Sequence, residues 1–140
     1  MCNGTKTPLI LKYYYMLYIK RTDAKNCACI PISLSSGPCF TTPPNLPHGI
    51  NGIIIHPSVM VGSNVTILHQ VTLGTRHINK GPKIGNNVFI GAGAKILGDI
   101  IVGDNAKIGA NAVVLTDVPA NCTAVGNPAR IIHLLQQENL

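Results

Sequence analysis

The sequence contains few large aromatic residues and few acidic ones. Its 140 residues include no Trp, two Phe, and five Asp or Glu residues against 11 Lys or Arg residues. A nucleic-acid interface needs an Arg-rich stripe or a platform of aromatic rings, and the chain has neither, so we expect no nucleic-acid partner. The lysines are scattered, and the net charge of +6 fits either a solvated surface or an anionic small-molecule partner.

Long apolar runs are also missing. The apolar segment Pro8–Ile19 is interrupted by Lys12 and is shorter than the about 20 residues of a membrane-spanning helix. It has no small-residue cleavage site, so export is not indicated. The five cysteines are an odd number, which favours reduced thiols over a disulfide framework. The closely spaced cysteines lack a matching second pair of ligands, so a metal site is not expected. We therefore expect a cytoplasmic protein without a transmembrane segment or a bound metal.

What the chain does have is a six-residue repeat. A fixed short period marks a solenoid, and a six-residue unit is too short for a pair of helices, so each unit is a short strand followed by a corner. Aliphatic residues lead the units at Ile55, Val61, Ile67, Leu73, Ile84, Ile90, Ile96, Val102, Ile108 and Val114. A second position repeats four residues later, at Val59, Val65, Val71, Val88, Ala94, Ile100, Ala106, Ala112 and Val118. Residues that tolerate a positive φ stand at Asn64, Asn87, Gly93, Asn105 and Asn111, which predicts corners there.

Three six-residue sides close into one triangular coil, so equivalent positions recur once every three units. Coils stacked about 4.8 Å apart pair as parallel strands, with the lead aliphatics inside the prism. This interior explains how an all-β protein can manage without Trp. The sequence therefore predicts a parallel β-helix in a single domain.

The repeat also indicates how the chain is divided. Leu73 and Ile84 are eleven residues apart instead of six, so five extra residues leave the prism as a loop, and such loops on rigid scaffolds often carry function. A solenoid end needs a cover, and the tyrosine-rich N-terminal segment is expected to be a cap with a short helix. We predict a cap over residues 1–29, a β-helix over residues 30–130 with its first coil degenerate, an excursion loop at residues 75–83, and a helical tail over residues 131–140.

Three segments of the chain read PHGINGIIIHPSVMVGSNVTILHQVTLGT, PKIGNNVFIGAGAKILGDIIVGDNAKIGANAVVL and AVGNPARII. On these segments, the stretch from His48 to Arg130 resembles the hexapeptide acyltransferases, and among them serine O-acetyltransferase and its short relatives. The resemblance implies a left-handed β-helix, a homotrimer and acetyl-CoA as donor; ordinary β-crossovers are right-handed, so the hand comes from the resemblance alone.

Acetyl transfer to a hydroxyl group needs a base, and imidazole suits this role near neutral pH. His48 precedes the flexible turn Gly49–Gly52, so its ring can project outward at a corner. In the family, the catalytic histidine stands just before the glycine-aliphatic run matched here by Gly52-Ile53-Ile54, with one extra residue between them in this chain. We expect His48 to be the base, with a purely structural corner histidine as the alternative.

His69 follows His48 by one coil plus half a side, which predicts a separation within about 10 Å. Its family counterpart is usually not catalytic, so we expect an acceptor contact or a hydrogen bond between coils. His77 lies in the excursion loop, four residues before Gly81, which stands where the full-length enzymes carry a second active-site histidine. His77 is a candidate to replace that histidine. His56 and His133 are expected to be structural.

The resemblance has gaps. Serine acetyltransferases orient the base with an upstream aspartate, but no acidic residue lies between Asp23 and Asp99. Asn51 or a backbone carbonyl could hold the His48 ring, although neither stabilises an imidazolium as a carboxylate does. We also expect no counterpart of the N-terminal helical domain of the full-length enzymes. Acetyl transfer is therefore expected, with L-serine or another small hydroxyl compound as acceptor.

The donor side matches more closely. Small residues let backbone groups approach the amide chain of pantetheine, and Ala92 and Ala110 are three repeat units apart, so one should lie above the other. By resemblance, four residues line the pantetheine arm and two cations approach the nucleotide phosphates. These residues are Gly74, Thr75, Ala92 and Ala110 for the arm, and Lys107 and Arg130 for the phosphates.

Two other functions remain open at this point. One keeps the mechanism but takes a sugar of a capsular or surface polysaccharide as acceptor. The other is a non-catalytic or carbonic-anhydrase-like β-helix, which would need three histidine ligands at coil-related spacing. The histidines from His48 through His56 and His69 to His77 are separated by eight, thirteen and eight positions, and none of these spacings equals a coil of three units.

Overall fold

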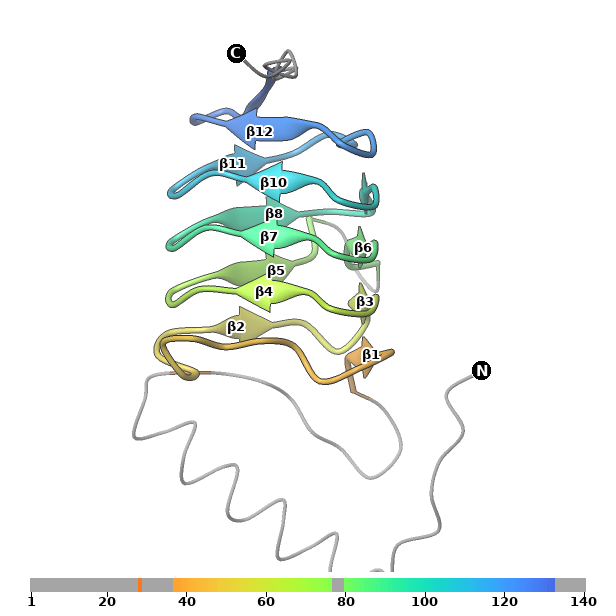
Figure 1. The fold of residues 1–140 in the computed structure, drawn as a ribbon, viewed down its shortest axis with the longest axis vertical. Coiled ribbons are helices and arrows are strands. Elements are labelled where there is room, and N and C mark those ends of the chain that lie inside the picture. Colours follow the sequence, from red (N-terminus) through yellow and green to blue (C-terminus); the bar gives the residue numbers. More distant parts are fainter. Residues whose placement is uncertain (1–27, 29–36, 77–79, 133–140) are drawn as a thin grey trace, which may run out of the picture.

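The computed structural model describes residues 28, 37–76 and 80–132, and its strands β1 to β13 form three stacks of short strands (Figure 1). The first stack contains β1 (Cys39–Phe40), β3 (Met60–Val61), β6 (Lys83–Ile84) and β9 (Ile101–Val102). The second contains β4 (Thr66–Ile67), β7 (Phe89–Ile90), β10 (Lys107–Ile108), β12 (Thr123–Val125) and β13 (Arg130–Ile132). The third contains β2 (Ile54–Ile55), β5 (Thr72–Gly74), β8 (Lys95–Leu97) and β11 (Val113–Val114).

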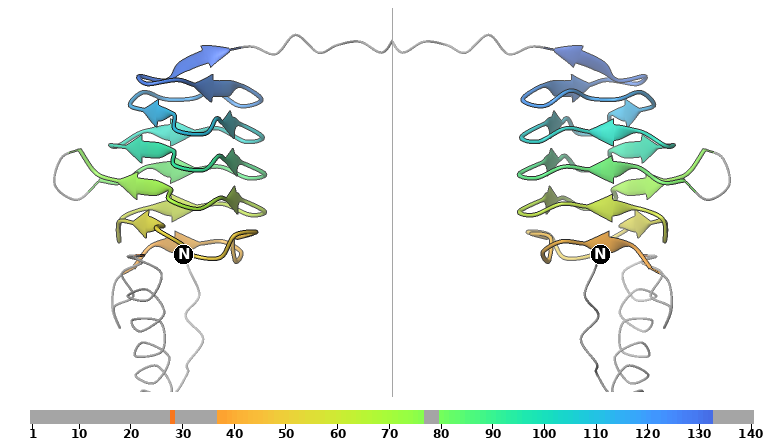
Figure 2. Two further views of the ribbon diagram at one scale, coloured as in Figure 1. Left: turned by 90° about the vertical axis from the view of Figure 1, so that its left-hand side faces the viewer. Right: turned by 90° about the vertical axis from the view of Figure 1, so that its right-hand side faces the viewer.

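From β1 to β12, consecutive strands belong to different stacks, and in the regular coils the chain turns through three sides before it returns to the same stack, as the two side views show (Figure 2). All strand pairs are parallel except β12 with β13. Ile84 pairs with Val102, three repeat units further on, as predicted for a triangular coil. Val61 pairs with Ile84, a separation that exceeds three units by five residues, which confirms that the extra residues lie between β5 and β6.

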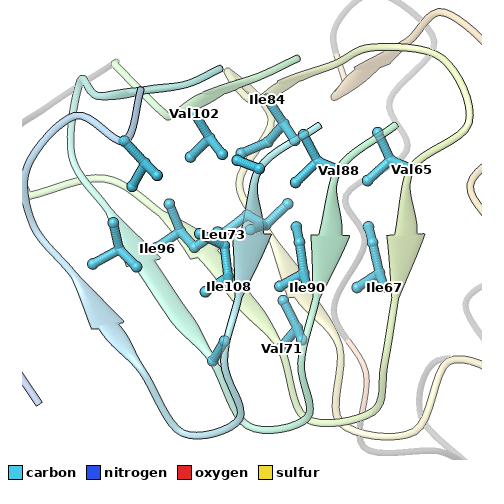
Figure 3. Close-up of a cluster of buried hydrophobic side chains, with 14 of the residues drawn as sticks. Val65, Ile67, Val71, Leu73, Ile84, Val88, Ile90, Ile96, Val102 and Ile108 are labelled. Carbon is cyan, nitrogen blue, oxygen red and sulfur yellow. The ribbon is translucent and has the colours of Figure 1, made fainter. Parts of the chain in front are cut away.

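The aliphatic repeat forms the core of the prism (Figure 3). All ten predicted lead residues are buried, Ile84 being the most exposed of them at 4%. The nine residues of the second repeating position are buried too, with Ile100 the most exposed at 7%. The strands are only two or three residues long, so each forms few ladder hydrogen bonds. Burial of the interior aliphatic side chains is therefore the main term that stabilises each coil.

The corners adopt the predicted backbone conformation. Asn64, Asn87, Asn105 and Asn111 have φ between 55° and 58°, and Gly93 has φ of 71°. Asn64 Nδ2 donates to Asn87 Oδ1 at 2.9 Å, and the same amide-to-amide bond continues through Asn105 to Asn121. These bonds explain why Asn, rather than Gly, occupies this corner. Gln70 also has a positive φ of 58°, which the sequence pattern did not predict.

The two ends of the prism differ from the regular coils. At the first coil, β1 pairs with β3 and Asn45 pairs with Thr66, so the degenerate coil joins the stack as expected. At the other end, the predicted helix over residues 131–140 is wrong for Ile131 and Ile132, which lie in β13. Pairing of β13 with β12 covers the open strand edge of the last coil. The hydrogen bonds formed at this edge outweigh the helix propensity of the two residues. Residues 133–140 and, apart from Ala28, the cap over residues 1–29 lie outside the described residues.

Two remaining sequence expectations concern the thiols and the membrane. Cys39 is disulfide-bonded, so the expectation of reduced thiols is wrong for this residue. An odd number of cysteines leaves one over but does not prevent a pair from forming. Within the part of the chain that the structure describes, no helix is long and apolar enough to cross a membrane.

Candidate functional site

Three extra residues in the first coil bring the two candidate histidines together. Ile54 pairs with Thr72 at the regular spacing of three repeat units, whereas the spacing between Asn45 and its partner Thr66 is three residues longer. The extra residues therefore lie between Asn45 and Ile54, in the turn that carries His48. His48 follows Asn45 by three residues, as His69 follows Thr66, so both histidines occupy the same corner of successive coils.

The two imidazole rings are in direct contact. His48 Nδ1 lies 2.8 Å from His69 Nδ1, and the ring centroids are 5.0 Å apart with the planes tilted by 42°. His48 is exposed and His69 is half-buried. The rings therefore lie within the predicted 10 Å, and the offset of half a side is cancelled by the extra residues of the turn.

The turn after His48 is held by its own hydrogen bonds. Asn51 Nδ2 donates to the His48 carbonyl oxygen at 3.2 Å, so this amide supports the backbone of His48 rather than its ring. The Gly49 amide donates to the Leu46 carbonyl at 3.0 Å, and both Gly49 and Gly52 have a positive φ. These contacts position the start of the turn and leave the His48 ring at its outer edge.

Above His69, the same corner carries small residues. The Gly93 amide donates to the His69 carbonyl at 2.9 Å, and the Asn111 amide donates to the Ala92 carbonyl at 2.8 Å. His69, Ala92 and Ala110 therefore follow one another on successive coils, and the predicted stacking of Ala92 with Ala110 is confirmed. Ala92 is half-buried and Ala110 is exposed, so a shallow, small-residue surface runs from the histidine pair along the corner.

The other predicted donor-binding residues divide into two groups. Arg130 pairs with Val125, whose side chain borders Gly109 next to Ala110, so Arg130 lies near the upper end of the small-residue corner. Lys107 is exposed in β10, on the strand that leads into this corner. Gly74 and Thr75 instead lie at and beyond the end of β5, on the far side of that strand from His69. One chain does not bring all six residues together.

The excursion loop is described only at its two ends, and His77 lies outside the described residues. Gly81 is buried, and a β-carbon there would lie 2.9 Å from Ser58 Oγ and 3.0 Å from Val59 Cγ2. A larger side chain at this position would need the neighbouring coil to shift. Lys80 forms an exposed ion pair with Asp99 at 3.3 Å, which links the end of the loop to the next coil.

His56 belongs to a separate corner. Its Nδ1 accepts a hydrogen bond from the Ser58 amide at 3.2 Å and contacts Ser58 Oγ at 2.8 Å, an arrangement that closes the local His-Pro-Ser turn. This contact fits the structural role expected for His56. Among the described residues, no group of three or more His, Cys, Asp or Glu side chains could hold a metal ion.

One neighbour of the histidine pair was missed by the sequence analysis. Lys95 Nζ donates to the Gln70 carbonyl at 2.7 Å and so places a cation beside the residue that follows His69. The sequence gives no signal for this contact, because the five-residue excursion lies between the two residues and removes any regular spacing.

Comparison with known proteins agrees with this architecture. Residues 81–116 match the family model for the bacterial transferase hexapeptide (six repeats). The chain is 58% identical over 84 residues to the chloroplastic serine acetyltransferase 1 of Arabidopsis thaliana, and 52% identical over 88 residues to the serine acetyltransferase of Helicobacter pylori. These matches cover 58% and 61% of this chain, but only 27% and 51% of the relatives.

Solved structures show the same likeness. Soybean serine acetyltransferase complexed with serine is 46% identical, with a TM-score of 0.65, over 68% of this chain and 40% of the soybean chain. A serine acetyltransferase in complex with CoA is 45% identical, with a TM-score of 0.64, over 68% of this chain and 39% of that one. The described β-helix is therefore a hexapeptide-repeat fold, and in this part the chain is similar to serine acetyltransferases.

Proposed function

We propose that this chain is an acetyl-CoA-dependent O-acetyltransferase of the serine acetyltransferase type, with His48 as its general base. The observation that carries the proposal is the exposed His48 ring, which contacts His69 at the foot of a corner lined by Ala92 and Ala110. The similarity to relatives named serine acetyltransferase, one solved with serine and one with CoA, supports L-serine as acceptor and acetyl-CoA as donor.

The chemistry follows from the free nitrogen of His48. Its Nδ1 is occupied by His69, so Nε2 is the atom that takes the proton from the acceptor hydroxyl group. As that O–H bond breaks, the oxygen attacks the thioester carbonyl carbon, and the C–O bond forms. The tetrahedral intermediate then collapses, the C–S bond breaks, and His48 returns its proton to the departing thiolate. The histidine pair thus ends the cycle in its starting state.

The small-residue corner is suited to an extended amide chain. Ala92 and Ala110 leave backbone groups of two successive coils open to a pantetheine arm that runs upward from His48. Arg130 and Lys107 lie near the upper part of this corner, where cations would meet the phosphates of the nucleotide. The donor would thus lie along the corner with its thioester beside the histidine pair.

The same geometry motivates the proposed assembly. Gly74 and Thr75 lie on the far side of β5 from the histidines, so they would serve the site of a neighbouring chain rather than their own. A homotrimer of prisms provides three such shared grooves. A cytoplasmic location completes the proposal, because the substrates named here are small intracellular metabolites.

A single assay tests the acceptor. Purified protein is incubated with acetyl-CoA and release of the CoA thiol is followed with a thiol reagent, in the presence of L-serine, homoserine, or neutral and amino sugars. Thiol release that depends on serine supports the proposal. Release that depends only on a sugar would assign the chain to polysaccharide acetylation, and no release with any acceptor would argue against acetyl transfer altogether.

A further inference from the structure

The contact between His48 and His69 constrains the protons on both rings. A hydrogen bond between two nitrogens at 2.8 Å contains one hydrogen, so one Nδ1 donates and the other accepts. In the neutral pair, the donor has a free lone pair on Nε2, and the acceptor carries its own proton on Nε2. Only the donor histidine is then able to act as a base through Nε2.

The surroundings of the two rings distinguish donor from acceptor. His69 is half-buried, and its backbone is anchored because its carbonyl accepts from the Gly93 amide at 2.9 Å. The next residue is fixed as well, since Lys95 Nζ bonds to the Gln70 carbonyl. His48 is exposed at the edge of its turn, where a substrate can reach it. The backbone of His69 is thus held in its coil and its side chain is the more buried of the two, so His69 is suited to be the support and the exposed His48 ring to be the one supported.

We infer that His69 is a positioning residue that accepts the Nδ1 proton of His48 and thereby keeps His48 Nε2 free to act as the base. This inference rests on the proposed acetyltransferase function and assigns to a neutral histidine the task of orienting the base, which a carboxylate often performs. No described carboxylate is in place to do so. Asp99 pairs with Lys80, Asp104 bonds to Asn86, and Asp117 accepts from the Ile101 amide.

The pair also carries the charge that forms during the reaction. When His48 takes the hydroxyl proton, its imidazolium still donates through Nδ1 to the neutral His69, and this bond becomes charge-assisted. A second proton on the pair would put hydrogen on both Nδ1 atoms and break the contact. The contact between the rings is therefore compatible with one added proton, which is all that one round of proton transfer requires.

The test replaces His69 and reads the tautomer of His48. The Oδ1 atom of Asn or Asp is three bonds from Cα, as Nδ1 is in His, so His69→Asn and His69→Asp keep an acceptor in place. His69→Phe keeps a ring of similar shape but removes the acceptor. Ring-¹⁵N NMR of the labelled full chain identifies which nitrogen of His48 carries the proton. His56→Phe, which alters a histidine in a separate turn, is the matched control.

We expect the Nδ1-protonated tautomer for His48 in the wild type, a shift toward the Nε2-protonated tautomer in His69→Phe, and recovery in His69→Asn and His69→Asp. In the presence of acetyl-CoA and the acceptor that the thiol-release assay identifies, kcat should fall roughly 10- to 100-fold in His69→Phe, with KM for acetyl-CoA unchanged. His69→Asp should be at least as active as His69→Asn, since a carboxylate stabilises the imidazolium better.

Two results would overturn the inference: an Nε2-protonated His48 in the wild type, or a His48 tautomer that is the same in His69→Phe and in the wild type. Both can be read without any enzyme activity. If the wild-type protein transfers no acetyl group, the proposed function fails, while the tautomer still decides whether His69 positions His48. Should His69→Phe not fold, an unchanged tautomer and kcat in His69→Asn support the inference, and a changed tautomer there contradicts it.

Discussion

His48 and His69 share one corner of the prism although they are three residues further apart in the sequence than one regular coil requires. The difference is taken up entirely in the turn between Asn45 and Ile54, after which the register returns to normal. A glycine-rich turn of this kind tolerates extra residues because it lies at the surface and outside the strand ladders. The insertion thus leaves the core unchanged and brings two imidazole rings into hydrogen-bond contact.

The first prediction concerns the proposed base. His48→Ala should lower kcat by roughly 10²- to 10⁴-fold, as the loss of a general base does, and leave KM for acetyl-CoA nearly unchanged. Steady-state kinetics with the best acceptor measures both constants. His56→Ala is the control and should keep near-normal turnover, because the His56 ring hydrogen-bonds to Ser58 in a separate turn. Normal turnover in His48→Ala would remove His48 from the mechanism.

The second prediction concerns the donor groove. Ala110→Trp should raise KM for acetyl-CoA roughly tenfold, equivalent to about 1.4 kcal/mol of binding free energy, because the indole would fill the small-residue corner. Thermal stability should change little, since Ala110 is exposed. Ala120→Trp makes the same change at an exposed alanine on another corner and should leave KM unaltered. Equal effects of the two substitutions would show that the corner above His69 does not bind the donor.

The third prediction concerns assembly. Light scattering coupled to size exclusion should give about three times the chain mass of 14.8 kDa, because in the proposed homotrimer Gly74 and Thr75 serve the groove of a neighbouring chain. Mixing His48→Ala chains with Thr75→Trp chains, each inactive alone, should then restore part of the activity by combining one intact half-site from each. A fully active monomer would contradict the shared groove.

The fourth prediction concerns the core. Ile96→Ala should lower the free energy of unfolding by about 2–5 kcal/mol, since its side chain is fully buried between neighbouring coils. Ile101→Ala removes the same atoms from a side chain that is 55% exposed and should cost less than about 1 kcal/mol. Urea unfolding followed by circular dichroism measures both. Similar losses in the two variants would show that the outer face of β9 is covered by another molecule.

The fifth prediction concerns the asparagine corner. Asn105→Ala loses the amide bonds to Asn87 and Asn121 and forces a β-carbon without a compensating hydrogen bond into a positive φ. Asn105→Gly loses the same bonds but adopts this φ freely. The alanine variant should therefore be less stable than the glycine variant by about 1–2 kcal/mol. The urea midpoints of the two variants compare their stabilities directly. Equal midpoints would mean that the amide bonds between the asparagines, and not the positive φ, determine the stability at this corner.

Several features could not be predicted from local patterns. The strand at Ile131–Ile132 forms because β12 has an open edge, and nothing within the tail itself encodes that edge. The positive φ of Gln70 follows its position in the column of corners between Gly52 and Gly93, against the usual preference of glutamine. The Cys39 disulfide likewise depends on which cysteines the fold brings together, which a count of cysteines does not reveal.

The sequence by itself determined the prism, its core and most of its corners, because each six-residue unit carries its own buried aliphatic side chains and its own corner residue. The pattern of buried and corner residues within a unit does not depend on which coil the unit pairs with. The five-residue excursion could be located from the same spacing. Only the tertiary structure decided what the corner beside His48 can do. The contact between His48 and His69 depends on where the extra residues of the first coil are absorbed, and pairing with the next coil determines that position.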